Sequence, residues 1–105
     1  MNLINCTPHA LNIIRTDQSI LTLEKSEFLA RAKVSREVVR TENGIEISKS
    51  IFGEVEGLPE PIEGTFFIVS LVVLERSPRT DLLSPGELVR GTDGQPLGCK
   101  GLNSK

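Results

Sequence analysis

Apolar and polar residues alternate with a period of two along several parts of this chain, the pattern of strands buried on one face. The clearest case runs from Ala30 to Ser35, where small and branched apolar residues alternate with Arg31, Lys33 and Ser35. Short stretches rich in leucine, isoleucine and other β-formers predict further strands, at residues 2–6, 11–15, 20–23 and 65–69. In all, the sequence predicts about seven short strands.

Turn signals separate these strands. Thr7-Pro8-His9-Ala10 predicts a β-hairpin that joins residues 2–6 to residues 11–15, since proline sets φ for the second position of a turn. Thr16 to Ser19 predicts the next turn. Asn43-Gly44 and Asp93-Gly94 are the strongest hairpin signals, since both turn positions favour positive φ. Ser84-Pro85-Gly86 predicts a tight turn.

Residues 66–74 form the longest apolar run, which Ser70 interrupts. They predict a strand covered on both faces, followed either by more strand or by a helix of about two turns capped by Ser70. The helix is favoured because a 12-residue central strand exceeds the usual length, and Ser77-Pro78 would end it. Gly53 to Gly64, with three glycines and two prolines, predicts a turn-rich acidic connector.

A chain of 105 residues predicts a single domain over residues 1–105. The expected fold is α+β and β-dominated: a small compact antiparallel or mixed sheet, or a barrel-like domain, with one short helix. Because exposed strand edges invite aggregation, the sheet is expected to close on itself or to pair with a partner.

Composition limits the function classes. The net charge is −2 and the chain has four Phe but no Trp or Tyr, which argues against binding nucleic acid. The longest apolar run is too short for a membrane span. The chain does not begin with the positively charged segment and apolar stretch of a secretory signal peptide. A cytoplasmic protein without membrane contact is therefore expected. Cys6, Cys99 and His9 are too few for a structural zinc site. No metal or cofactor is predicted, and the two thiols are expected to be reduced.

Three polar clusters are candidate binding sites. In the first, Asn5, Thr7 and His9 either hydrogen-bond the local turn or contact a ligand, and His9 is the one side chain suited to acid–base chemistry near neutral pH. In the second, Arg79 either pairs with Asp81 or binds an anion through its guanidinium fork. Ser70, the third, is either a plain helix cap or the start of an anion site.

No established catalytic pattern is present: the sequence lacks a GxSxG elbow, a phosphate-binding GxxxxGK[ST] loop, a GxGxxG turn and an HExxH motif. No catalytic residue is therefore predicted, and a binding protein is favoured over an enzyme.

Several short motifs follow one another along the chain. They are the N-terminal Asn5-x-Thr7-Pro8-His9 and the C-terminal Arg79-x-Asp81, Pro85-Gly86-x-Leu88-Val89-Arg90 and Gly98-Cys99-x-Gly101-Leu102. Together they resemble a family of small proteins from bacteriophages, prophages and bacterial genomes. The chain departs from that pattern at Cys6, where the family tends to carry an aliphatic residue. The resemblance implies a phage-related origin and no particular activity.

Small acidic phage proteins often act by binding, and some sequester nucleotide-derived immune signals of the host without cleaving them. By that analogy, the leading hypothesis is a homo-oligomer that binds a small phosphorylated, nucleotide-like ligand such as an ADP-ribose or cyclic-nucleotide signal. The predicted contacts are Asn5, Thr7, His9, Ser70, Arg79, Asp81 and Arg90. The alternatives are an inhibitor that covers the surface of a host enzyme, and a small hydrolase or lyase that uses His9.

Overall fold

The computed structural model describes all 105 residues. It contains eight strands and one short helix, in the order β1 (Asn2–Asn5), β2 (Leu11–Ile14), β3 (Ile20–Leu23), β4 (Arg31–Glu42), β5 (Ile45–Glu56), β6 (Thr65–Ile68), α1 (Leu71–Arg76), β7 (Leu82–Arg90) and β8 (Pro96–Asn103). Strand predominates, with a single short helix. The β-dominated α+β class expected from the sequence is confirmed.

Six strands form one mixed sheet, in the spatial order β1-β6-β7-β8-β2-β3. The pairs β1–β6, β6–β7 and β2–β8 are parallel, whereas β7–β8 and β2–β3 are antiparallel. A bridge between Asn5 and Lys25 brings the β1 edge next to the chain that leaves β3. The sheet is therefore a nearly closed, barrel-like body, which is one of the architectures predicted from the sequence.

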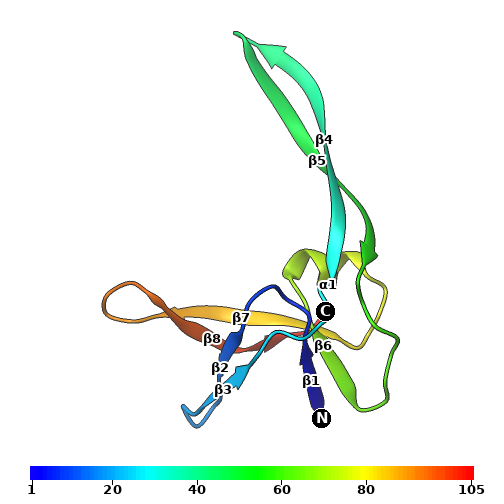
Figure 1. Ribbon diagram of the computed structural model, residues 1–105. Coiled ribbons are helices and arrows are strands. Elements are labelled where there is room, and N and C mark those ends of the chain that lie inside the picture. Colours follow the sequence, from blue (N-terminus) through cyan, green and yellow to red (C-terminus); the bar gives the residue numbers. More distant parts are fainter.

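The remaining two strands, β4 and β5, pair only with each other. They form a long hairpin, the arm (residues 31–56), which projects away from the body (Figure 1). The arm turns at Asn43-Gly44, as predicted, and both residues have positive φ (52° and 75°). The radius of gyration is 16.7 Å, against about 13 Å for a compact domain of this length, because the arm extends the molecule.

The core of the body lies between the sheet and α1. Phe67, Ile68 and Val69 are completely buried, and the helix adds Val73 and Leu74. All of these except Ile68 cluster with Cys6, Ala30 and Leu82. The stretch predicted to be covered on both faces is thus the centre of the fold.

The helix begins and ends where the sequence predicts. The Ser70 hydroxyl accepts a hydrogen bond from the Val73 N–H (3.4 Å), and the helix ends at Arg76 with Ser77 as its C-cap. Chain extension beyond Ser70 as strand, the alternative interpretation, is wrong. The helix lets Val73 and Leu74 turn into the core within two turns.

The hairpin predicted at Thr7–Ala10 is wrong. The strands on either side of it do not pair: β1 lies parallel to β6, and β2 lies between β3 and β8. The local turn forms, but partners far along the chain outcompete the nearest strand. The hairpins at 16–19 and 93–94 do form, between β2 and β3 and between β7 and β8.

The tight turn predicted at Ser84-Pro85-Gly86 is also wrong, because β7 runs straight through these residues. Pro85 has no N–H to donate, and it is tolerated because β6 pairs only with Leu82 and Leu83, so that β7 has a single neighbour, β8, at this point. The Pro85 carbonyl accepts a side-chain hydrogen bond from Asn103 (3.2 Å). Gly86 is required by the close approach of β8, since a Cβ there would clash with the Lys100 carbonyl and lie 2.7 Å from the Gly101 oxygen. The connector predicted at Gly53–Gly64 begins later, after β5 ends at Glu56.

Candidate functional site

The N-terminal cluster is a closed hydrogen-bond network built on Asn5. The Asn5 side chain is 2% exposed, and its Nδ2 donates to the carbonyls of His9 (2.8 Å) and Leu23 (3.1 Å). Its Oδ1 accepts from the N–H (2.9 Å) and the hydroxyl (2.6 Å) of Thr7. Asn5 therefore has no free polar atom for a ligand, while His9 is exposed.

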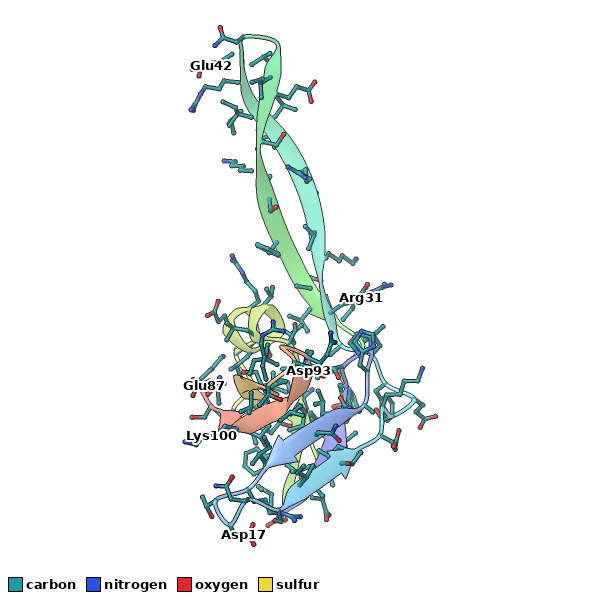
Figure 2. All side chains as sticks on the ribbon, turned by 90° about the vertical axis from the view of Figure 1, so that its left-hand side faces the viewer. Asp17, Arg31, Glu42, Glu87, Asp93 and Lys100 are labelled. Atoms are coloured by element: carbon teal, nitrogen blue, oxygen red, sulfur yellow. The ribbon has the colours of Figure 1, made fainter.

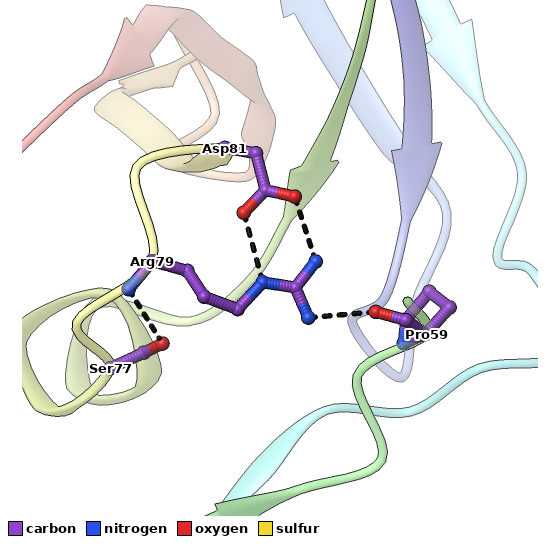
Figure 3. A network of polar contacts seen from close by, with 4 residues as sticks. All are labelled: Pro59, Ser77, Arg79 and Asp81. Carbon is purple, nitrogen blue, oxygen red and sulfur yellow. Dashed lines mark hydrogen bonds and ion pairs between the residues drawn. The ribbon is translucent and has the colours of Figure 1, made fainter. Parts of the chain in front are cut away.

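Arg79 and Asp81 form a bidentate ion pair beside α1 (Figure 3). Arg79 Nε donates to Asp81 Oδ1 (3.0 Å) and Nη2 to Oδ2 (2.7 Å), while Nη1 donates to the Pro59 carbonyl (2.7 Å). The guanidinium also lies over the Phe67 ring, 5.4 Å from its centroid. Through Pro59, Arg79 links the connector after the arm to the loop after α1. The Arg79–Asp81 ion pair is one of the two alternatives predicted from the sequence.

The ion pair makes stability depend on pH. The hydrogen bonds from Arg79 lower the pKa of Asp81, and the pKa of Arg79 is raised mainly by the hydrogen bond to Asp81. Since a carboxylate with a lowered pKa stabilises the fold above its unfolded pKa of about 3.9, that contribution is full at neutral pH. It is lost as the pH falls through the lowered value.

Asp81→Asn is therefore expected to destabilise the protein by about 2 kcal/mol at pH 7 and to flatten its stability profile in acid. Urea unfolding between pH 7 and pH 2 measures both effects, with the exposed Glu87→Gln as a control for net charge. A variant that loses stability in acid as steeply as the wild type would contradict the assignment.

Arg90 lies far from Arg79 along the same segment. Arg79 precedes β7 and Arg90 is its last residue, and nine strand residues span roughly 30 Å. Arg90 is exposed, and its Nη1 donates to the Gly94 carbonyl (2.9 Å) in the β7–β8 turn. A single chain therefore does not bring the two guanidinium groups together.

The two cysteines are both buried and unpaired. Cys6 follows β1, whereas Cys99 lies in β8, and the strands β6 and β7 lie between them. Burial raises the pKa of the Cys6 thiol, although the Ser26 hydrogen bond and the Arg79 charge act in the opposite direction. The two thiols, whose proximity was open from the sequence, form no disulfide.

A large hollow lies elsewhere, across the barrel-like sheet. It is open to solvent, has a volume of about 1040 Å³, and collects residues from β1, β2, β3, β7 and β8. Its apolar lining comprises Met1, Leu3, Ile13, Ile14, Leu21, Val89 and Leu102. The polar lining includes Arg15, Gln18 and Lys100, and it contains no carboxylate.

The two cations of the hollow are brought together by parallel pairing. Ile14 of β2 is in register with Lys100 of β8, which places Arg15 one residue beyond that pair. Neither cation has a carboxylate within 4.0 Å, and the Arg15 side chain donates to the Ser19 hydroxyl (3.3 Å). Glu87 of β7 is in register with Lys100, and Asp17 lies close enough to Arg15 for the two charges to interact, but neither cation forms an ion pair. An apolar floor beside two cations can receive a ligand that carries both an apolar ring and an anionic group.

None of the seven site residues predicted from the sequence lines this hollow; Arg90 comes nearest along the chain, next to Val89. Asn5, Thr7, Ser70, Arg79 and Asp81 are engaged in local hydrogen bonds. Sequence reasoning missed Arg15, Gln18 and Lys100. Arg15 and Gln18 belong to no motif, Lys100 is the unspecified position of one, and the three come from opposite ends of the chain.

Comparison with known proteins gives no match: no family model, no curated protein and no solved structure matches this chain. The resemblance to the phage family stays a prediction that rests on its motifs. No helix of the structure has the length and apolar character needed to cross a membrane.

Proposed function

We propose that the protein is a homo-oligomeric binding protein of the cytoplasm that holds a small phosphorylated, nucleotide-like molecule in the hollow of its sheet. The observation that carries the proposal is the combination of an apolar lining with Arg15 and Lys100, two cations that form no ion pair within 4.0 Å. The volume, about 1040 Å³, is at the upper end of the range for small-molecule sites, and barrel mouths are common places for such sites.

The ligand's two halves would use different parts of the hollow. A base or ribose would lie against side chains such as Ile14, Leu21 and Leu102, while a phosphate would receive charge-assisted hydrogen bonds from the two cations. The lining has no imidazole, thiol or carboxylate, which favours sequestration over turnover. With a phage-related origin, the natural ligand would be a nucleotide-derived signal of the host.

Calorimetry with linear and cyclic ADP-ribose and with cyclic dinucleotides tests the proposal. At least one of these ligands is expected to bind, and Arg15→Ala and Lys100→Ala are each expected to weaken it about tenfold, the loss of roughly 1.4 kcal/mol. Arg36→Ala, which removes an exposed cation from the arm, is the control and should change nothing. Equal affinity in all three variants, or no binding of the panel, would overturn the proposal.

The same measurement separates the hollow from the site residues predicted from the sequence. If Arg79→Ala or Arg90→Ala weakens binding while Lys100→Ala does not, the ligand binds around those arginines instead. Ligand recovered intact after denaturation of the complex supports sequestration, whereas product that depends on His9 supports the hydrolase or lyase alternative.

A protein–protein contact is the second candidate function. It is favoured by the arm, whose exposed apolar residues include Val34, Val38, Val39, Ile45 and Ile51.

A further inference from the structure

Gln18 has an unusual backbone conformation for a residue with a long side chain. Its φ is +72°, in the left-handed region, and the only other non-glycine residue with positive φ is Asn43 in the turn of the arm (52°). This region is costly for residues other than glycine, although asparagine enters it more readily than most. Residues held in such conformations cluster at ligand sites. The side chain of Gln18 is therefore a candidate for a function that glycine could not perform.

The turn that contains Gln18 is fixed without the help of its side chain. This turn joins β2 to β3, and Asp17 marks it at the opposite end of the molecule from the tip of the arm (Figure 2). The Gln18 N–H donates to the Arg15 carbonyl (3.0 Å), and the Arg15 N–H donates to the Ser19 carbonyl (2.8 Å). The Asp17 carboxylate accepts from the Ser19 N–H (2.9 Å). The carboxamide of Gln18 takes no part in the hydrogen bonds of the turn.

The same turn forms part of the wall of the hollow. Gln18 lines the hollow together with Arg15 and Thr16 of the turn and Lys100 of β8. Gln18 is also exposed. A molecule that enters the hollow therefore meets a carboxamide whose donor and acceptor are both free, beside the two cations.

Among the side chains of the lining, only Gln18 offers a donor and an acceptor in one plane. Arg15 and Lys100 donate only, and Thr16 has a single hydroxyl. Adenine presents the complementary pair of atoms, the N7 acceptor beside the N6 amino donor, and glutamine binds these two atoms in protein–nucleic acid complexes. Hypoxanthine has a carbonyl in place of the amino group, so its oxygen would oppose the oxygen of the carboxamide. The lining thus suits adenine better than hypoxanthine.

We propose that Gln18 determines the specificity of the hollow for ligands with an adenine base, by donating to N7 and accepting from the N6 amino group. Arg15, in the same turn, binds the phosphate, so that one turn contacts both halves of the ligand. This inference rests on the proposed function, because it names the base of the nucleotide-like molecule that the hollow would hold.

Calorimetry tests the specificity with ligands that differ only in the base. The two pairs are ADP-ribose with inosine diphosphate ribose, and cyclic di-AMP with cyclic di-IMP. In at least one pair, the wild type is expected to bind the adenine member at least about tenfold more tightly, as one bidentate contact to a base provides. Gln18→Gly is expected to bind both members equally. Its fold is retained, because glycine adopts the left-handed conformation without strain.

Asn43→Gly is the matched control, since it makes the same exchange at the other left-handed residue, in the turn of the arm. It should keep the full preference for adenine. Equal binding of the two bases by the wild type, or an unchanged preference in Gln18→Gly, would overturn the assignment of Gln18 and leave the hollow as the binding site. Binding of cyclic di-GMP alone, dependent on Arg15 and Lys100, would have the same meaning. No binding of any of these ligands would overturn the proposed function as well.

Discussion

Replacement of Asn5 by alanine is expected to destabilise the protein by about 3 kcal/mol, because it leaves several backbone groups without partners. The Leu23 and His9 carbonyls and the Thr7 N–H all bond the Asn5 side chain. The Leu23 contact matters most, since it links β1 to β3 at the two edges of the six-stranded sheet. Ser26, which follows β3, adds two hydrogen bonds to this contact between the sheet edges. Its N–H (3.0 Å) and its hydroxyl (2.7 Å) both donate to the Asn5 carbonyl.

Thermal unfolding measures this loss. For a domain of this size, about 3 kcal/mol corresponds to a decrease in Tm of roughly 12–24 °C. Asn2→Ala is the control, since Asn2 is an exposed residue of the same strand and should shift the Tm little. If the Tm of Asn5→Ala decreases no more than that of the control, water replaces the Asn5 side chain, and the contact between β1 and β3 does not depend on that side chain.

Features that the sequence predicted correctly are those encoded by a few adjacent residues. Ser70 caps α1 through its own side chain, and Asn43-Gly44 adopts the positive φ values that a tight hairpin needs. Each signal acts within four residues, so no knowledge of the rest of the fold is required.

Features that it predicted wrongly depend on distant partners. The chain turns at Thr7–Ala10, but β1 pairs with β6, where Phe67 and Ile68 are buried, and not with β2. Likewise, Gly86 resembles a turn residue in the sequence, while in the structure it allows β8 to approach β7. Proline and glycine are compatible with both roles, and only the neighbouring strand distinguishes them.

The candidate site shows the same limit. Arg79 and Asp81 are two residues apart, and their pairing was one of the alternatives open from the sequence. Arg15 follows β2 and Lys100 lies in β8, and the two line one hollow because β2 and β8 pair in parallel.

Gly57→Ala is expected to be as damaging as loss of Asn5, about 3 kcal/mol, because two effects combine at one position. Gly57 has φ of +90°, where a side chain is strained. A Cβ would also clash with the Leu29 carbonyl oxygen and lie 2.9 Å from its carbon. This backbone cannot easily retreat, since the adjacent Ala30 is buried in the core and its N–H donates to the Cys6 carbonyl (3.0 Å).

Gly64→Ala separates the two effects. Gly64 lies at the other end of the same connector with φ of +76°, but its added Cβ would have no atom within 4 Å. It is therefore expected to cost only about 1 kcal/mol, from backbone conformation alone. Chemical denaturation of the two variants gives the difference directly, roughly 2 kcal/mol from steric conflict at the base of the arm. Equal losses would show that Leu29 moves freely, and that the junction between arm and body is not fixed by the contact at Gly57.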